Sequence, residues 1–143
     1  MVVVRLTVDL PVETVFDYFL DFRNENQWNV VAHDIVLLTD PPIAVGSRFS
    51  GQYDRMGQME YEIQEFDRPR FASVTGNAKL FRWVSTFSFA EDERSTTVEC
   101  TMDPHPKGLL RVAKPLMAKM VQQQMERGLA SLKTTLEAKA GVD

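Results

Sequence analysis

The strongest structural signal in this sequence is residues 81–102, FRWVSTFSFAEDERSTTVECTM. Hydrophobic and polar side chains alternate on both sides of the charged run at residues 91–94, which is the pattern of two half-buried strands joined by a hairpin turn. One face of the first strand carries Phe81, Trp83, Ser85, Phe87 and Phe89, and one face of the second carries Thr96, Val98, Cys100 and Met102. These residues predict an antiparallel hairpin with one apolar, largely aromatic face.

The strand pattern continues toward the N-terminus. From Gly46 onward, shorter alternating segments are separated by turns such as the one at residues 67–69, and an extended segment at residues 30–38 precedes them. Residues 2–10 alternate as well. A long meander leaves an unpaired edge, so we expect this N-terminal strand to pair with the last strand near Met102 and extend the sheet.

Helical patterns flank the strands. Pro11 ends the first strand and begins a helix, because its missing N–H does no harm in a first turn, and residues 21–29 predict a turn and a second short helix. Residues 108–139 carry the drifting apolar stripe of a long amphipathic helix, which Pro115 should kink or divide. One strand, two short helices, a run of strands and one long helix make an α+β fold.

Proline, glycine and serine add four finer expectations. Pro104 and Pro106 should end the last strand, because proline cannot donate to a hydrogen-bonded ladder. Gly128 should let the sheet come close to the long helix. Gly51 and Ser85, small residues on otherwise aromatic faces, should leave space beneath that helix.

The order of elements also predicts a cavity. A helix about 10 Å wide does not cover a seven-stranded sheet that is roughly 30 Å across, so the sheet should wrap around the helix and leave space between them. The candidates for lining this space are Phe49, Tyr53, Tyr61, Trp83, Ser85 and Phe87 from the strands and Met117, Val121 and Met125 from the helix. Methionine suits a wall that accepts varied ligand shapes.

Six segments of the sequence resemble the polyketide cyclase/dehydrase and lipid-transport family, a branch of the START-like (SRPBCC, Bet v 1-like) superfamily. They are residues 11–18, 24–29, 45–49, 66–71, 106–110 and 132–137. The resemblance implies a helix-grip fold over residues 1–143 as a single ligand-binding domain: a seven-stranded antiparallel sheet around the C-terminal helix, with two short helices after the first strand and a deep hydrophobic cavity. The charged turn at residues 91–96 departs from the Gly-Gly-Thr turn of many relatives, which puts the subfamily in doubt.

Composition excludes several classes of protein. Hydrophobic residues make up 44% of the 143 residues, as in an ordinary globular protein, and the net charge of −4 does not fit nucleic-acid binding. The single Cys100 allows no intramolecular disulfide and, together with the interrupted apolar run at the N-terminus, leads us to expect a cytoplasmic protein.

Few residues suggest catalysis. His33 and His105 are the two histidines, and neither has a partner at a recognised metal-ligand spacing, so we expect no metal and no cofactor. Cys100 shares a face with apolar residues, which indicates packing rather than a nucleophile. Trp28 is interpreted as a packing residue, with a place in the lining of the pocket entrance as the alternative. The sequence therefore shows no compact acid–base group and predicts no catalytic residue.

The leading hypothesis is a binding protein for a small hydrophobic ligand, a lipid or a polyketide-like molecule, for transport or sequestration. Hydroxyl and indole groups of Tyr53, Tyr61, Trp83 and Ser85 would orient that ligand. The same groups could stabilise an enolate, so a polyketide cyclase/dehydratase is the alternative and enzymatic activity stays open. A co-chaperone-like protein-interaction module is a second alternative.

The C-terminal helix suggests a second partner. Its basic residues outnumber its acidic ones although the protein is acidic, and a basic amphipathic helix can approach an anionic membrane surface transiently. The basic residues are Arg111, Lys114, Lys119, Arg127, Lys133 and Lys139. A solvated face on a core helix is the simpler interpretation. A homodimer is left open.

Overall fold

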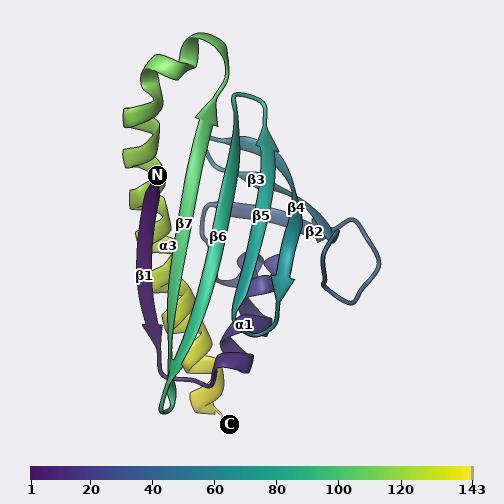
Figure 1. Ribbon diagram of the computed structural model, residues 1–143, viewed down its shortest axis with the longest axis vertical. Coiled ribbons are helices and arrows are strands. Elements are labelled where there is room, and N and C mark those ends of the chain that lie inside the picture. The colour runs from purple at the N-terminus through teal and green to yellow at the C-terminus, as the bar shows by residue number, and fades with distance from the viewer. Residues whose placement is uncertain (143) are drawn as a thin grey trace.

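The computed structural model of the protein describes residues 1–142. The strands are β1 (Val2–Val8), β2 (Ala32–Leu37), β3 (Arg48–Tyr53), β4 (Gly57–Asp67), β5 (Phe71–Ala78), β6 (Phe81–Asp92) and β7 (Ser95–Pro106). The helices are α1 (Val12–Leu20), the 3₁₀ turn η1 (Phe22–Asn24), α2 (Glu25–Trp28), the 3₁₀ segment η2 (Gly108–Ala113) and α3 (Lys114–Val142). Figure 1 shows one sheet with α3 behind it, α1 at the lower end and η2 at the top between β7 and α3.

The sheet is antiparallel throughout and follows the order β1-β7-β6-β5-β4-β3-β2. The predicted hairpin is β6 and β7, in which Phe81 pairs with Pro106 and Asp92 with Ser95. Strand β1 pairs with β7 with Val2 opposite Met102, which confirms the predicted pairing of the two chain-distant strands. This pairing covers an edge of β7 that would otherwise present unpaired backbone groups.

Two irregularities in the ladder bend the sheet. The pairing of β2 with β3 shifts between His33 and Val36, and that of β4 with β5 shifts between Ile63 and Glu65. An extra residue in one strand of an antiparallel pair bends that strand and increases its twist. The outer strands β2 and β3 therefore turn away from the plane of β6 and β7, as Figure 1 shows.

Helix α3 lies against β1 and β7 on the inner face of the sheet. Its buried residues Val121, Leu129, Leu132 and Leu136 recur at helical spacing. Near its C-terminal end it is also tied to β1 by polar contacts, because the backbone N–H of Asp9 donates to Oε2 of Glu137 at 2.9 Å. The helix-grip fold expected from the sequence is thus the observed one.

The structure corrects the expectation for Pro104, because β7 continues past it, whereas the strand does end at Pro106. Pairing with β1 stops at Met102, so beyond that residue β7 has a neighbour on the β6 side alone. A strand that is open on one side tolerates the missing N–H of proline. Pro115 lies in the first turn of α3 and separates it from η2, as expected.

Two glycine predictions are also wrong in detail. A Cβ at Gly128 would lie 3.3 Å from the ring of Trp28, so Gly128 admits α2 rather than the sheet. The space beside Gly51 is filled by the side chain of Ile35, where a Cβ would overlap it. Gly51 therefore adds no volume to the cavity, whereas Ser85 does line it.

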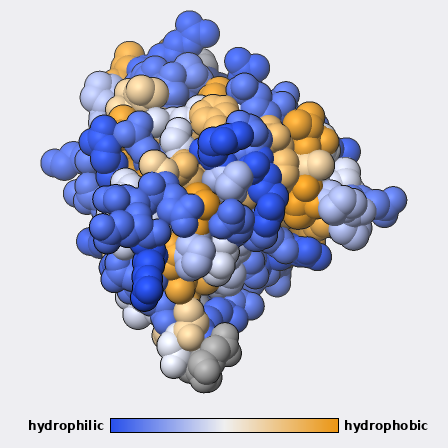
Figure 2. Space-filling view, turned by 60° about the horizontal axis from the view of Figure 1, so that its bottom comes forward, coloured by the Kyte–Doolittle hydropathy of each residue, from blue (hydrophilic) through white to orange (hydrophobic). Residues whose placement is uncertain are grey.

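The surface differs between the ends of the molecule. Figure 2 brings the lower end of Figure 1 forward and shows a mainly hydrophilic surface with smaller hydrophobic areas between charged side chains. Strongly exposed apolar residues instead occur in η2 and at the start of α3, near the top of Figure 1: Leu109 is 94%, Val112 89% and Leu116 72% exposed. Among residues 1–142, no helix combines the length and apolar composition needed to cross a membrane.

Candidate functional site

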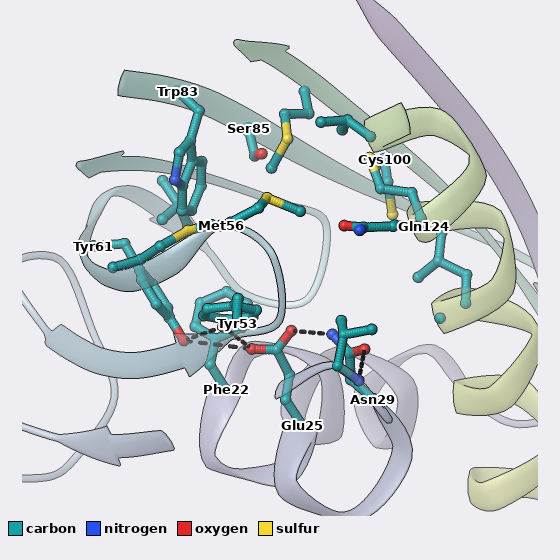
Figure 3. Close-up of a pocket in the computed structure, with 18 of the residues that line it drawn as sticks. Phe22, Glu25, Asn29, Tyr53, Met56, Tyr61, Trp83, Ser85, Cys100 and Gln124 are labelled. Carbon is teal, nitrogen blue, oxygen red and sulfur yellow. Dashed lines mark hydrogen bonds between the residues drawn. The ribbon is translucent and has the colours of Figure 1, made fainter. Parts of the chain in front are cut away.

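A cavity of about 140 Å³ lies between the inner face of the sheet, α2 and α3. Most of its wall is apolar, and Figure 3 shows side chains from all three sides pointing into it. The apolar lining residues are Phe19, Phe22, Trp28, Val31, Met56, Met59, Val74, Trp83, Phe87, Met102, Val121, Met125, Gly128 and Leu129. The more polar ones are Glu25, Asn29, Tyr53, Tyr61, Ser85, Cys100 and Gln124.

Three acidic or hydroxyl groups meet at one end of the cavity. The hydroxyl of Tyr53 donates to Oε2 of Glu25 at 2.5 Å, and that of Tyr61 lies 3.4 Å from the same oxygen. The two tyrosine hydroxyls are 2.9 Å apart. Figure 3 shows Glu25 rising from α2 to meet the tyrosines, which come from β3 and β4. We call Glu25, Tyr53 and Tyr61 the polar cluster.

The single turn of α2 positions the carboxyl group. Asn29 follows Glu25 by four residues, so both side chains lie on the same face of the turn. Nδ2 of Asn29 donates to Oε1 of Glu25 at 3.2 Å, while Oδ1 of Asn29 accepts from the backbone N–H of Val31 at 3.3 Å. The second bond fixes which end of the amide faces Glu25. Both carboxyl oxygens therefore have a donor.

Burial dominates the titration of the polar cluster. Removal from water raises the pKa of Glu25, although its bonds from Tyr53, Asn29 and Tyr61 oppose that shift. Burial and the neighbouring carboxyl of Glu25 also raise the pKa of Tyr53 and of Tyr61. Both tyrosines thus keep their protons at neutral pH. The cavity wall within residues 1–142 contains no Lys, Arg or His, so Glu25 faces no protein cation there.

Aromatic rings surround the polar cluster. Phe49 stacks on Tyr61 with an interplanar angle of 14°, and Phe22 meets Tyr61 edge-on at 77°. The ring of Trp83 lies 5.6 Å from that of Tyr61, between centroids. The indole of Trp83 fits here because residue 76 is glycine: a Cβ at that position would overlap the ring. Rings packed on several sides fix the direction of the Tyr61 hydroxyl.

Two further polar atoms in the wall lack a hydrogen-bond partner among the described residues. They are Nε1 of Trp83, a donor, and Oε1 of Gln124. Figure 3 shows the amide of Gln124 reaching from α3 into the cavity. A buried polar atom without a partner is destabilising, so this wall favours a ligand or water that supplies one.

Seven of the nine side chains predicted to line the cavity do so: Tyr53, Tyr61, Trp83, Ser85, Phe87, Val121 and Met125. Phe49 does not reach the cavity because it is fully buried behind Tyr61. Met117 packs against the core one helical turn before Val121 but is not part of the wall. Contact between these seven side chains and a ligand stays a prediction.

Glu25, Asn29 and Gln124 are among the wall residues that the sequence interpretation missed, and they are the ones with carboxyl or amide groups. Residues 24–29 were used in the sequence interpretation for the family resemblance and for a short helix. Their polar composition gave no reason to place them in a cavity wall. A helical spacing of four between Glu25 and Asn29 is a signal, but it does not tell which way a one-turn helix faces. Trp28, interpreted from the sequence as a packing residue, is buried and also lines the cavity.

The histidines and the cysteine lie apart from the polar cluster. Nε2 of His33 lies 3.0 Å from Asp54 and that of His105 3.2 Å from Asp103, both on the exposed surface. Cys100 lines the cavity, but burial raises the pKa of its thiol and keeps it protonated. Within residues 1–142 no three His, Cys, Asp or Glu side chains come together as metal ligands.

Comparison with known proteins shows the family and the fold of the chain. The model of the family described as polyketide cyclase/dehydrase and lipid transport matches residues 1–137. The chain belongs to this family. In this member of the polyketide cyclase/dehydrase and lipid-transport family, Glu25, Tyr53 and Tyr61 form the polar end of the cavity. A search of curated proteins found no match.

Solved structures share the fold of this family member. A START superfamily protein from Mycobacterium smegmatis has a TM-score of 0.78 at 17% identity, covering 96% of this chain and 97% of that one. The Zhui aromatase/cyclase from a Streptomyces strain has a TM-score of 0.83 at 13% identity, covering 97% and 94%. A protein from Thermus thermophilus has a TM-score of 0.82 at 16% identity, covering 96% and 97%. At these identities the likeness shows the fold.

Proposed function

We propose that this protein binds a small hydrophobic ligand in the cavity between the sheet and α3, for transport or sequestration. The observation that carries the proposal is a largely apolar cavity with one polar end, formed by Glu25, Tyr53 and Tyr61. Apolar walls supply affinity, and a few placed polar groups orient the ligand. A cavity of about 140 Å³ is similar to the engineered cavities of about 150 Å³ that hold benzene. One substituted ring is thus the size of ligand that fits without rearrangement.

The test is native mass spectrometry of freshly purified protein, combined with titration of small apolar probes followed by tryptophan fluorescence. Trp28 and Trp83 both line the cavity, so an occupant should change the emission of either. A co-purifying small molecule, or saturable binding of apolar probes, supports the proposal. Absence of both, with Trp83→Phe leaving the fluorescence response unaltered, contradicts it.

A second candidate function is a cyclase or dehydratase, and the polar cluster is the observation that favours it. The sequence alone shows no compact acid–base group, whereas the structure brings Glu25 within 2.5 Å of the Tyr53 hydroxyl. A carboxylate in an apolar site can remove a proton next to a carbonyl, and tyrosine hydroxyls can donate to the resulting enolate. In the described structure both hydroxyls are already directed at each other and at Glu25, so binding remains the leading proposal.

The proposed membrane contact has one supporting observation. Residues of η2 and the start of α3 expose apolar side chains next to basic ones: Leu109, Val112 and Leu116 beside Lys107, Arg111 and Lys114. Lys107 also binds the carbonyl of Ala78, which joins η2 to the β5–β6 turn where Leu80 is exposed. Apolar side chains with interleaved positive charge suit the interface of an anionic membrane.

A further inference from the structure

We infer that the cavity selects a positively charged hydrophobic ligand, a small aromatic or alicyclic amine, through Glu25. This inference rests on the proposed ligand-binding function and names its ligand class. It follows from the polar cluster and its surroundings, in which a carboxyl group, aromatic rings and an unpaired acceptor face the same space. Each of these three features attracts an N–H donor or a cation.

The hydrogen bonds around Glu25 suit the ionised carboxylate. Oε1 faces the NH₂ group of Asn29, whose orientation is fixed by the bond from Val31 N–H to its oxygen. Oε2 lies within reach of the hydroxyls of Tyr53 and Tyr61. An ionised carboxylate accepts hydrogen bonds and donates none, so three donors around its two oxygens match that form. These hydrogen bonds favour a negative charge on Glu25, whereas burial opposes it.

That negative charge lacks a counter-ion. A buried charge is destabilising unless a partner of opposite sign accompanies it, and such partners are usually Lys, Arg or His. None of these lines the cavity within residues 1–142. Burial is the largest influence on the pKa of Glu25 and raises it, because a charge without a partner is unfavourable away from water. A ligand cation placed beside Glu25 would supply the missing charge.

Two other features of the wall also suit a cation, whereas the unpaired indole N–H of Trp83 needs an acceptor elsewhere on the ligand. Aromatic faces attract cations through the negative charge of their π-systems, and this attraction is strongest where water is excluded. Phe22 and Trp83 each pack against the ring of Tyr61, whose hydroxyl meets Glu25. Across the cavity, Oε1 of Gln124 has no donor among the described residues. An ammonium group has donors for the carboxylate of Glu25, whereas a ligand carboxylate has none and would be repelled by it.

The test compares three probes that share one ring and differ in charge: 2-phenylethylamine, 2-phenylethanol and phenylacetate. At neutral pH these are a cation, a neutral molecule and an anion. Calorimetry with the full chain should show the amine binding at least about tenfold tighter than the alcohol, and phenylacetate weakest. In Glu25→Gln the preference for the amine should disappear while the alcohol still binds.

The control is Glu126→Gln, which removes the same charge from the exposed face of α3 and should keep the preference. Two results overturn the inference and leave the proposed function standing. One is equal affinity for the amine and the alcohol in the wild type. The other is a preference for the amine that persists in Glu25→Gln. If none of the three probes binds, both fail. Should Glu25→Gln not fold, as judged by thermal unfolding, the wild-type comparison decides alone.

Discussion

The hydroxyl of Tyr53 lies 2.5 Å from Oε2 of Glu25, across 28 positions of sequence. This bond joins α2, a single turn, to β3 on the outer part of the curved sheet. It places an acid inside a cavity whose wall is otherwise mostly apolar. We therefore expect the selectivity and pH response of the cavity to depend on the state of this carboxyl group.

The first prediction concerns stability and pH. Burial raises the folded-state pKa of Glu25, so between its unfolded pKa, about 4.3, and its folded pKa the folded protein binds more protons than the unfolded chain. The contribution of Glu25 to stability therefore falls as pH rises through that window. We expect Glu25→Gln to be more stable than the wild type at neutral pH, and the difference to shrink as the pH approaches about 4.

Urea denaturation of both proteins across this range measures the difference directly. Subtracting the two free energies of unfolding cancels the contribution of the titratable groups that the wild type and the variant share. The groups that face Glu25 are Asn29, Tyr53 and Tyr61, and neither tyrosine titrates below neutral pH. A Glu25→Gln variant that loses stability at neutral pH would show that the ionised group stabilises the fold, against this prediction.

The second prediction separates binding from catalysis. Tyr53→Phe and Tyr61→Phe should each weaken the binding of a bound probe by under about tenfold, because an orienting hydrogen bond contributes about 1 kcal/mol. Tyr53→Phe should have the larger effect, since its bond to Glu25 is shorter than that of Tyr61, 2.5 against 3.4 Å. No turnover of candidate polyketides is expected.

Tyr18→Phe is the matched control, because its hydroxyl donates to Gln27 at 3.0 Å outside the cavity wall. It should leave affinity unchanged. Loss of one donor to an oxyanion in an enzyme commonly lowers the rate by about 10²–10³. Cyclisation or dehydration by the wild type that is lost in either cavity variant, with binding retained, would establish the enzyme instead.

The third prediction concerns Gly76. A Cβ at this position overlaps the indole of Trp83, so Gly76→Ala should push the ring into the cavity. We expect a loss of about 1–3 kcal/mol in the free energy of unfolding, as for other overpacked cores, together with weaker binding of apolar probes. Urea denaturation and fluorescence titration measure the two effects. Gly141→Ala, with no atom within 4 Å of the added Cβ, should change neither.

The fourth prediction concerns the exposed apolar end of the molecule. The protein should co-sediment with vesicles containing phosphatidylserine, and Leu109→Ser with Val112→Ser should reduce this severalfold, because these side chains are 94% and 89% exposed and available for insertion. High salt should also weaken it. Val30→Ser, which changes an 84% exposed residue elsewhere, is the control. Equal sedimentation with neutral vesicles, or none with either, would contradict the prediction.

Local periodicity determined most of the fold. The alternation at residues 81–102 predicted β6 and β7, and the alternation at residues 2–10 predicted the strand that pairs with β7. Such patterns are informative because a strand with one buried face must place every second side chain toward the core. The exception is the end of β7, where Pro104 is tolerated because β1 has already ended.

The sequence also determined part of the cavity wall, because alternate residues of a strand share a face and an apolar face turns toward the long helix. Tertiary structure alone decided where the acid lies. A turn as short as α2 has no repeating pattern to show which side faces inward, so Glu25 looked like any surface carboxylate until β3 and β4 brought Tyr53 and Tyr61 to it. Its missing counter-ion follows from three-dimensional packing, since charge balance inside a cavity depends on which distant residues share the wall.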